Sequence, residues 1–460
     1  MKAGEQTVND NLDLVRSALS GMAWPMVPTD AGALALAVQF QLEQTQWWPP
    51  DELERHQMQQ LQLLLRHAHD TLPFWRERFQ KAGFDPDREV TPELFRSLPL
   101  MTRADVQVHG EALLSRQVPR DHGAVAKGET SGSTGRPITY YGTGLTQFFW
   151  RAYTLRDHLW HQRDFSGKLA AIRTKIEDKV VQGWGPATDS VFATGPCAML
   201  NIRADIDAQL EWLRQQAPQY LISHPHNLRE LARKSIALRV SLPGLREVRS
   251  FGAVLPADLR AASRQAWDVP VTDLYSAEEV GYIALQCPQH EHYHAQFENV
   301  IVEVLDSAGT PCAPGEVGRV VLTTLHNFAM PLVRYAIGDY AEAGESCDCG
   351  RGLPVIKRIM GRDRNMLTKP DGSQHWPSFP AEIWTAVAPI RQFRLIQKSL
   401  DRIEAQFAAA NDLGREQRDR LTGSLQKSLG YPFNIELVRV DEMSGSVNFK
   451  FEDFISEIRR

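Results

Sequence analysis

Long hydrophobic runs and a surplus of basic residues are both missing from this sequence of 460 residues. No stretch of about 18 apolar residues occurs, and the N-terminal MKAGEQTVND is polar where a signal peptide would be apolar. We therefore expect a cytoplasmic protein with no membrane partner. The formal net charge is -5, with both signs interspersed. Because nucleic-acid binders need a basic stripe, nucleic acid is not an expected partner.

Cysteine is also scarce, and five residues in so long a chain are too few for a disulfide scaffold. Their spacing is more informative, because Cys287 begins the run CPQHEHYH and Cys347 and Cys349 follow in CDCG. Zinc takes four nitrogen or sulfur ligands in a closed structural site, so three cysteines and one histidine of the run would suffice. Free buried thiols and surface histidines are the alternative.

The length exceeds what one hydrophobic core usually supports, which favours two domains. Apolar residues recur near a period of 3.6 over about 1–116 and predict helices, whereas short apolar runs alternate with helical stretches over about 117–361. The charged, glycine-punctuated GRDRNMLTKPDGSQ predicts a hinge. The expected architecture is α/β: a large multi-layer N-terminal domain with mixed sheets (1–361), then a small, mobile α+β domain (362–460).

Short apolar runs predict strands within these domains, and longer amphipathic stretches predict helices. Predicted strands are 168–172, 220–222, 270–274, the hairpin 300–305 with 318–324, then 393–397, 403–409 and 435–440, and predicted helices are 226–236 and 416–429.

A glycine-, serine- and threonine-rich segment, TSGSTGRP at 130–137, is a candidate phosphate-binding loop. Gly132 and Gly135 permit positive φ values, so successive backbone N–H groups can converge on an anion, and the hydroxyl groups add further donors. The spacing matches neither the Walker loop nor the dinucleotide fingerprint. Taken alone, the segment is equally consistent with a plain surface turn.

Three further motifs follow this loop: YSAEEVG at 275–281, RYAIGDY at 334–340 and GRDR at 361–364. In this order the chain resembles the acyl-activating, adenylate-forming superfamily, in particular its phenylacetate-CoA ligase-like branch. The resemblance runs from the segment TLPFW to the C-terminus.

The resemblance implies a site for ATP and AMP, with Tyr275 near adenine and Asp339 at the ribose hydroxyls. Two positions depart from the motif: Ser276 replaces a glycine, and Glu278 stands where a threonine usually contacts the α-phosphate. The remaining nucleotide-binding residues that it implies are Thr130, Ser131, Gly132, Ser133, Thr134, Gly135, Arg136, Gly252 and Arg362.

The resemblance also implies catalytic roles for Glu279, as a Mg²⁺ ligand, for Arg334 and for Lys450 near the C-terminus. For Lys450, an exposed strand lysine is the alternative. The same branch has a similar cysteine and histidine pattern, which favours His294 beside Cys287, Cys347 and Cys349 as the structural zinc site.

The implied reaction is ATP-dependent activation of a small carboxylic acid to an acyl-adenylate with release of pyrophosphate, followed by acyl transfer to coenzyme A. Relatives that use an amine or another acceptor are one alternative. A catalytically altered, zinc-containing nucleotide-binding module is another, because Glu278 places a carboxylate near the phosphates. The resemblance also allows a homodimer.

Overall fold

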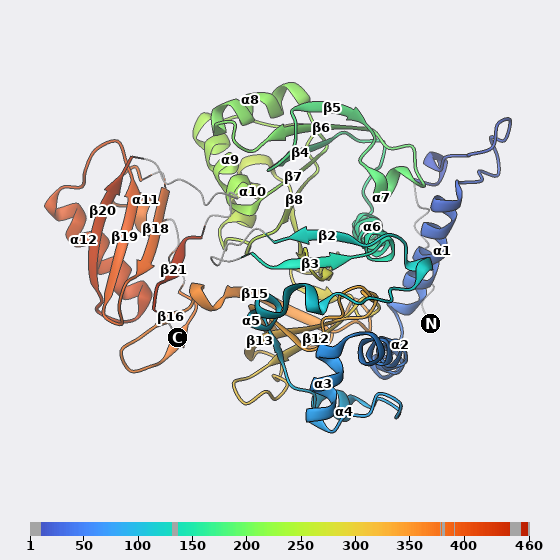
Figure 1. The fold of residues 1–460 in the computed structure, drawn as a ribbon. Helices are drawn as coiled ribbons and strands as arrows, with labels where there is room; N and C mark the ends of the chain where they lie inside the picture. Colours follow the sequence, from blue (N-terminus) through green and yellow to red (C-terminus); the bar gives the residue numbers. More distant parts are fainter. Residues whose placement is uncertain are drawn as a thin grey trace.

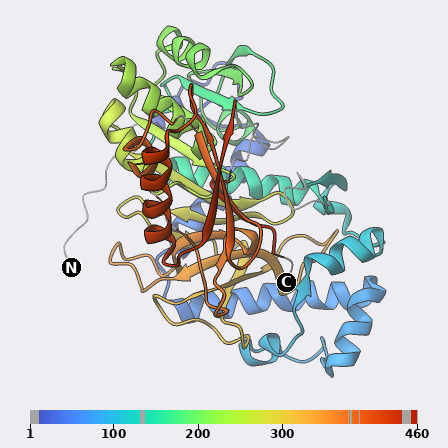
Figure 2. The same cartoon turned by 90° about the vertical axis from the view of Figure 1, so that its left-hand side faces the viewer.

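The structure is a computed structural model, and it describes residues 11–130, 137–377, 379, 382–390, 392–441 and 452–458. A large body built around one sheet carries a smaller domain at its side (Figure 1). Viewed from that side, the sheet of the small domain and one helix lie in front of the large body (Figure 2).

The helices and strands have the following bounds. The α-helices are α1 (Asp30–Thr45), α2 (Pro50–Thr71), α3 (Pro73–Ala82), α4 (Pro92–Arg96), α5 (Arg103–His109), α6 (Gly144–Trp160), α7 (Pro186–Asp189), α8 (Ile206–Gln216), α9 (Pro225–Leu238), α10 (Leu259–Trp267), α11 (Glu382–Thr385) and α12 (Arg415–Leu429). The 3-10 helices are η1 (Leu12–Leu14), η2 (Gly110–Leu113), η3 (Arg120–His122) and η4 (Asp363–Asn365).

The strands up to the middle of the chain are β1 (Met101–Thr102), β2 (Ala126–Glu129), β3 (Thr139–Gly142), β4 (Leu169–Arg173), β5 (Lys179–Gln182), β6 (Pro196–Asn201), β7 (Tyr220–Ser223), β8 (Glu247–Phe251), β9 (Val271–Ala277), β10 (Gly281–Gln286) and β11 (Tyr293–Ala295). The later strands are β12 (Val300–Leu305), β13 (Val317–Thr324), β14 (Tyr335–Ala343), β15 (Val355–Arg362), β16 (Leu367–Thr368), β17 (Gln374–His375), β18 (Gln392–Gln397), β19 (Arg402–Ala408), β20 (Asn434–Val440) and β21 (Phe454–Ser456).

Among the described residues, thirteen strands form one sheet in the order β12-β13-β14-β15-β11-β10-β9-β8-β7-β4-β6-β5, with β1 added beside β14. The strands from β9 to β6 run parallel, and those from β12 to β9 run antiparallel. The sheet therefore has a parallel half and an antiparallel half that meet at β9. Ligands of open α/β sheets bind beyond the carboxyl ends of such parallel strands.

Helices α8, α9 and α10 cover one face of the parallel half (Figure 1). In α9, Leu228, Leu231 and Ala232 recur at the spacing of one helix face and are fully buried. They pack with strand residues such as Leu221 and Val248. The opposite face of these strands is left for α6 and for a cavity.

Helices α2 and α3 cover the antiparallel half. Leu61 and Trp75 are buried against strand residues that include Leu322 and Tyr335. Part of the region predicted to be helical, Met101–Thr102, instead extends this sheet as β1, paired in parallel with β14. Two residues are too short a run to show strand periodicity in the sequence.

The small domain begins after β15, where η4 and the ribbon of β16 and β17 lead into a sheet with the order β20-β19-β18-β21. Leu421, Leu425 and Leu429 of α12 lie one turn apart and pack on Phe407 and Ile403 of this sheet. These residues form a core separate from the cores of the large body.

The predicted α/β architecture with a smaller second domain is confirmed, and so are the predicted strands and helices, within one to three residues at most ends. The antiparallel hairpin of β12 and β13 has the predicted pairing, with Val300 opposite Thr324. Among the described residues, no helix has both the length and the apolar character that crossing a membrane would require.

Two glycines of α12 provide a matched test of this local structure. Gly423 lies exposed inside the helix with open space around its Cα, so Gly423→Ala should stabilise the small domain by about 1 kcal/mol. Gly430 ends the helix at φ 66°, so Gly430→Ala should destabilise it by about 1–2 kcal/mol. Calorimetric unfolding of both variants checks this, and a shift of the same sign in both would contradict it.

Candidate active site

A cavity of about 1040 Å³ opens beyond the carboxyl ends of the parallel strands. Its walls come from β4, β6, β7 and β8, from α6, from the turn of β9 into β10, and from the small domain. The cavity thus lies where the parallel half, the antiparallel half and the small domain meet, which is the usual place for a ligand in an open α/β sheet.

At the end of the cavity near β14, the side chains are arranged around Asp339. Its Oδ2 accepts a 2.7 Å hydrogen bond from the Tyr275 hydroxyl, and its Oδ1 accepts a 3.2 Å bond from Nε of Arg362. Asp339 and Arg362 are cross-strand partners on β14 and β15. Burial, with the charge of Asp339, holds the pKa of Tyr275 well above its usual value, so its hydroxyl remains a donor.

The backbone conformation explains why glycine occupies one position in each of the motifs RYAIGDY and GRDR. Gly338 has φ 91° and Gly361 has φ 107°, values that other residues rarely adopt. Gly361 lies at a β-bulge, where Tyr340 pairs with Gly361 but Ala341 pairs with Ile359. Such bulges redirect neighbouring side chains, and this one precedes Arg362 directly.

Three carboxylate and hydroxyl residues of the YSAEEVG motif line the same end: Ser276, Glu278 and Glu279. Glu279 is buried and Glu278 is exposed. Burial raises the pKa of Glu279, although the guanidinium groups of Arg103 and Arg362 oppose the shift. A buried carboxylate facing a cavity is a suitable ligand for a hard divalent cation.

The candidate phosphate loop connects two paired strands, β2 and β3. Thr130, at the first end, lines the cavity, and its Oγ1 accepts hydrogen bonds from Arg103 at 3.3 Å and from the backbone N–H of Ile138 at 3.1 Å. Ser131, Gly132, Ser133, Thr134, Gly135 and Arg136 lie outside the described residues.

Lys450 also lies outside the described residues, but the segment that follows it reaches the cavity. Glu452 forms an ion pair with Arg364 of the GRDR motif at 2.6 Å. The Asp453 carboxylate accepts two bonds from Arg229 of α9, at 2.9 and 3.1 Å. The small domain is thereby tied both to the hinge motif and to the large body.

Gly252 lies at the cavity wall with φ 80°, directly after β8. A Cβ at this position would lie 3.4 Å from the ring of His224, so the backbone approaches His224 closely. His224 also lines the cavity, and its Nδ1 lies 3.3 Å from the carbonyl oxygen of Phe251.

Among the described candidates for nucleotide binding and catalysis, Arg334 alone does not line the cavity. Its guanidinium donates to both oxygens of Glu303 at 3.1 and 3.0 Å, and to the carbonyl oxygens of Arg96 and Leu98. Its backbone has φ 47°. These contacts fasten the loop before β14 to the segment after α4, so the geometry gives Arg334 a structural rather than a catalytic place.

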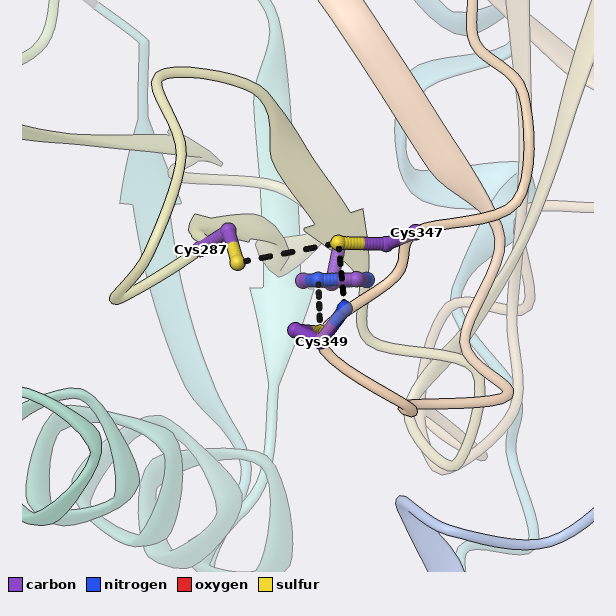
Figure 3. A group of neighbouring side chains, drawn as sticks. Cys287, Cys347 and Cys349 are labelled. Atoms are coloured by element: carbon purple, nitrogen blue, oxygen red, sulfur yellow. Dashed lines mark hydrogen bonds between the residues drawn. The ribbon is translucent and has the colours of Figure 1, made fainter.

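A second cluster lies on the other side of β10. The ligand atoms of Cys287, His294, Cys347 and Cys349 all lie within 4.8 Å of one another, and the three sulfur atoms are turned towards a common point (Figure 3). The Cys287 and Cys347 sulfurs are 3.9 Å apart, and the Cys349 sulfur is 3.4 Å from Nε2 of His294.

These separations suit a tetrahedral zinc ion, around which two sulfurs lie about 3.8 Å apart and a sulfur and a nitrogen about 3.6 Å apart. The Nδ1 of His294 faces the carbonyl oxygen of Leu353 at 3.3 Å, which leaves Nε2 for a metal. Burial lowers the pKa of His294 to about 4, so the ring is neutral near pH 7. The neighbouring His290 instead contacts Asp348, at 2.6 Å.

Several cavity residues escaped the sequence interpretation. Arg103 and Trp376 line the cavity from segments without a recognised motif, and Trp376 packs on Tyr340 with ring centroids 5.1 Å apart. Cys197, which lies outside the cysteine and histidine pattern, is a buried part of the wall. In the sequence, Arg103 belongs to the segment MTRAD at 101–105, which matches none of the recognised motifs.

No family model matches the chain. It is 24% identical over 405 residues to a phenylacetate-coenzyme A ligase of Pseudomonas putida, covering 82% of this chain and 88% of the relative. It is 27% identical over 343 residues to a phenylacetate-coenzyme A ligase of Escherichia coli (strain K12), covering 69% of this chain and 72% of the relative.

The fold is similar to that of a 2-hydroxyisobutyryl-CoA ligase solved in the postadenylation state in complex with R3-HIB-AMP. That superposition has a TM-score of 0.71 at 19% identity and covers 90% of this chain and 92% of the ligase. The same ligase in its thioesterification state gives 0.58 at 20% identity, covering 90% and 91%. The chain therefore has the fold of the adenylate-forming ligases, and its predicted resemblance to the phenylacetate-CoA ligase branch of that superfamily is confirmed.

Proposed function

We propose that the protein is an ATP-dependent ligase that converts a carboxylic acid into an acyl-adenylate, releases pyrophosphate, and passes the acyl group to coenzyme A. The observation that carries this proposal is the carboxylate of Asp339, held between Tyr275 and Arg362 at the end of a large cavity. A carboxylate fixed in this way accepts hydrogen bonds from the two hydroxyl groups of a ribose.

In the first half-reaction the substrate carboxylate attacks the α-phosphorus of ATP, and the bond to pyrophosphate breaks. The residues position the reactants and neutralise charge, because the phosphorus centre needs no protein nucleophile. Asp339 anchors the ribose, and the ring of Tyr275 packs near adenine. Thr130 and the loop at 131–136 bind the phosphates, together with Arg103.

Glu279 would hold Mg²⁺, which neutralises charge on the phosphates when it is bound. Its burial beside Arg103 and Arg362 supports this role, because both guanidinium groups favour its ionised form. Glu278 is exposed at the rim. There, solvent screens its charge from the α-phosphate. Lys450 is proposed to stabilise the leaving pyrophosphate.

Coenzyme A is the proposed acceptor, supported by the names of the relatives and by the ligase solved with CoA. An amine acceptor remains the alternative for the second half-reaction. The contacts of Asp339 with Tyr275 and Arg362 argue against an inactive nucleotide-binding module, since they keep the carboxylate in place for binding the ribose of ATP. The cysteines of the cluster form no disulfide bond, and reduced cysteines that can bind zinc suit a reducing, cytoplasmic compartment.

Rotation of the small domain between the half-reactions is proposed about the hinge at Arg362 to Arg364. The present arrangement, with Asp453 bound to Arg229, corresponds to adenylation. The closer superposition on the postadenylation state than on the thioesterification state supports this assignment. For the second step, the pair formed by Arg229 and Asp453 must separate.

The zinc site is proposed to be structural. Four protein ligands would close the coordination shell and leave no position for a substrate. The segment at Cys349 also fixes the turn between α1 and α2, because Arg351 bonds Gln46 and the N–H of Gly352 donates to the Gln46 carbonyl oxygen at 2.9 Å. Zinc would therefore stabilise this packing.

Acid-dependent ATP–pyrophosphate exchange tests the function and the role of Asp339 together. We expect exchange with at least one acid of a panel of aromatic and aliphatic acids, and a rise in the KM for ATP of about 10- to 100-fold in Asp339→Asn, since charge-assisted hydrogen bonds are lost. Asp306→Asn, in an exposed loop, is the control. Exchange with no acid, or an unchanged KM in Asp339→Asn, would contradict the proposal.

Arg229→Met tests the orientation of the small domain. Breaking a buried ion pair costs about 3–5 kcal/mol, so exchange should fall about tenfold or more. Thioester formation from supplied acyl-adenylate should not fall, because that step needs the pair broken. Arg214→Met, on the exposed side of α8, is the control. Equal slowing of both half-reactions would refute the assignment.

Metal analysis tests the zinc site. We expect one zinc per chain in the purified protein and none in Cys349→Ser, with a fall in Tm of about 5 °C or more. Cys312→Ser, outside the cluster, should retain the metal. A metal-free wild type whose Tm does not respond to a chelator would end the proposal.

A further inference from the structure

The part of the cavity away from Asp339 is lined by one face of the parallel strands. Ala171, Ile222 and Arg249 are direct partners across β4, β7 and β8, so their side chains share a face. Alternate residues of each strand continue that face, and the members that line the cavity are Leu169, Ala171, Arg173, Cys197, Met199, Ile222, Arg249 and Phe251.

Two arginines on a face that is otherwise apolar are unusual, because a buried charge is costly without a partner. Arg173 is the last residue of β4, and its guanidinium lies over the ring of Phe251, with the central carbon 4.4 Å from the ring centroid. Within the described ranges it has no hydrogen bond and no ion pair, and its Nε is shielded from solvent. This cation is partly buried and faces the cavity.

Arg249 is better compensated. Its Nη2 lies 2.7 Å from Oδ2 of Asp157, but that carboxylate also receives Nη1 of Arg163 at 2.7 Å. Arg163 in turn binds Glu247 at 2.6 Å. With Arg173, three guanidinium groups face two carboxylates, which leaves one positive charge without a partner.

The histidines beside this network do not change that balance. Burial lowers the pKa of His158 well below its usual value, and lowers that of His161 too, so both rings are neutral near pH 7. The pKa of Arg173 is lowered by burial and by the charge of Arg249. A guanidinium with so high an ordinary pKa nevertheless stays charged.

No acidic residue of the cavity wall lies on this side, as far as the structure describes the chain. The acidic lining residues belong to the Asp339 end, to the start of α10 or to the small domain, and they are Asp258, Glu278, Glu279, Asp339, Glu452 and Asp453. Helix α6 also lines the cavity, and its described lining residues include the cation Arg151 but no carboxylate. A negative charge for Arg173 must therefore come from a ligand.

We propose that the acid substrate carries a second carboxylate, which Arg173 binds with Arg249 behind it, so that the enzyme activates dicarboxylic acids. The proposal rests on the function proposed above and names its substrate class. One carboxylate attacks the α-phosphorus and forms the new oxygen–phosphorus bond while pyrophosphate leaves. The other carboxylate is unchanged and stays ionised through both half-reactions.

The reacting carboxylate is a poor partner for Arg173. It loses its charge as the mixed anhydride forms, so a guanidinium bound to it would stabilise the ground state more than the transition state and oppose the reaction. A group that remains anionic benefits equally before and after adenylation. Phe251, over whose ring Arg173 lies, and Trp150 both line the cavity, so they offer the rest of the acid an apolar environment.

The test compares acids of matched size with and without a second carboxylate, namely hexanoate with adipate and 4-methylphenylacetate with 4-carboxyphenylacetate. Acid-dependent pyrophosphate exchange should show kcat/KM at least about 100-fold higher for one diacid than for its matched monoacid, because the site holds a charge that only the diacid satisfies. In Arg173→Met that ratio should fall to about one, with the KM for ATP unchanged. Arg173→Lys should restore part of it.

Circular dichroism and the Tm of Arg173→Met establish that the variant is folded, and Arg203→Met, in an exposed turn, is the control that keeps the ratio. Calorimetric titration of adipate and 4-carboxyphenylacetate into wild type and Arg173→Met gives a readout apart from turnover, and binding should be lost in the variant. Preference for monoacids, equal loss for both classes in Arg173→Met, or a raised KM for ATP or coenzyme A would overturn the proposal. Exchange with monoacids alone would leave the ligase function standing, whereas exchange with no acid would remove both.

Discussion

The carboxylate of Asp339 is the point on which the arrangement of this protein depends. It joins three strands, because Tyr275 comes from β9, Asp339 from β14 and Arg362 from β15. Arg362 is also the last residue before the small domain. The same group that would bind the ribose therefore fixes the residue from which the small domain departs. In the proposed function, nucleotide binding and domain orientation would therefore be coupled through one side chain.

The two halves of the sheet carry different parts of the candidate site. The antiparallel half carries the nucleotide end and the cysteine cluster, where short connections bring polar side chains from neighbouring strands together. The parallel half carries the deep wall of the cavity, where residues two apart share a face. Three arginines beside that half are compensated to different degrees: Arg163 pairs with two carboxylates, Arg249 shares one of them, and Arg173 pairs with none among the residues that the structure describes. Because burial penalises an unpaired charge, the least compensated arginine, Arg173, is the one for which a ligand in the cavity would bring the largest gain.

The sequence predicted those parts of the site whose residues lie within one local pattern. Tyr275, Asp339 and Arg362 belong to short motifs, and the structure brings them together. The cysteine and histidine residues also converge, since β10, β11 and β15 are neighbours. Arg334 shows where prediction from a motif fails. Its guanidinium donates to Glu303, which lies 31 residues earlier in the chain and outside the motif, so the motif alone did not indicate this contact. Arg173 could not be recognised either, because whether a carboxylate reaches it depends on the packed wall of the cavity and not on β4 alone.

The segment before β21 connects the small domain both to the large body and to the hinge motif. Asp453 is bound to Arg229 of the large body, while Glu452 beside it is bound to Arg364 of the hinge motif. Adjacent carboxylates thus hold the segment after Lys450 from two sides. The pair with Arg364 lies within the part that would turn, whereas the pair with Arg229 crosses to the other domain. In the rotation proposed above, the pair with Arg364 moves as a unit, whereas the contacts of Asp453 with Arg229 and His226 separate. The strength of these cross-domain contacts would then set how readily the small domain leaves its present orientation.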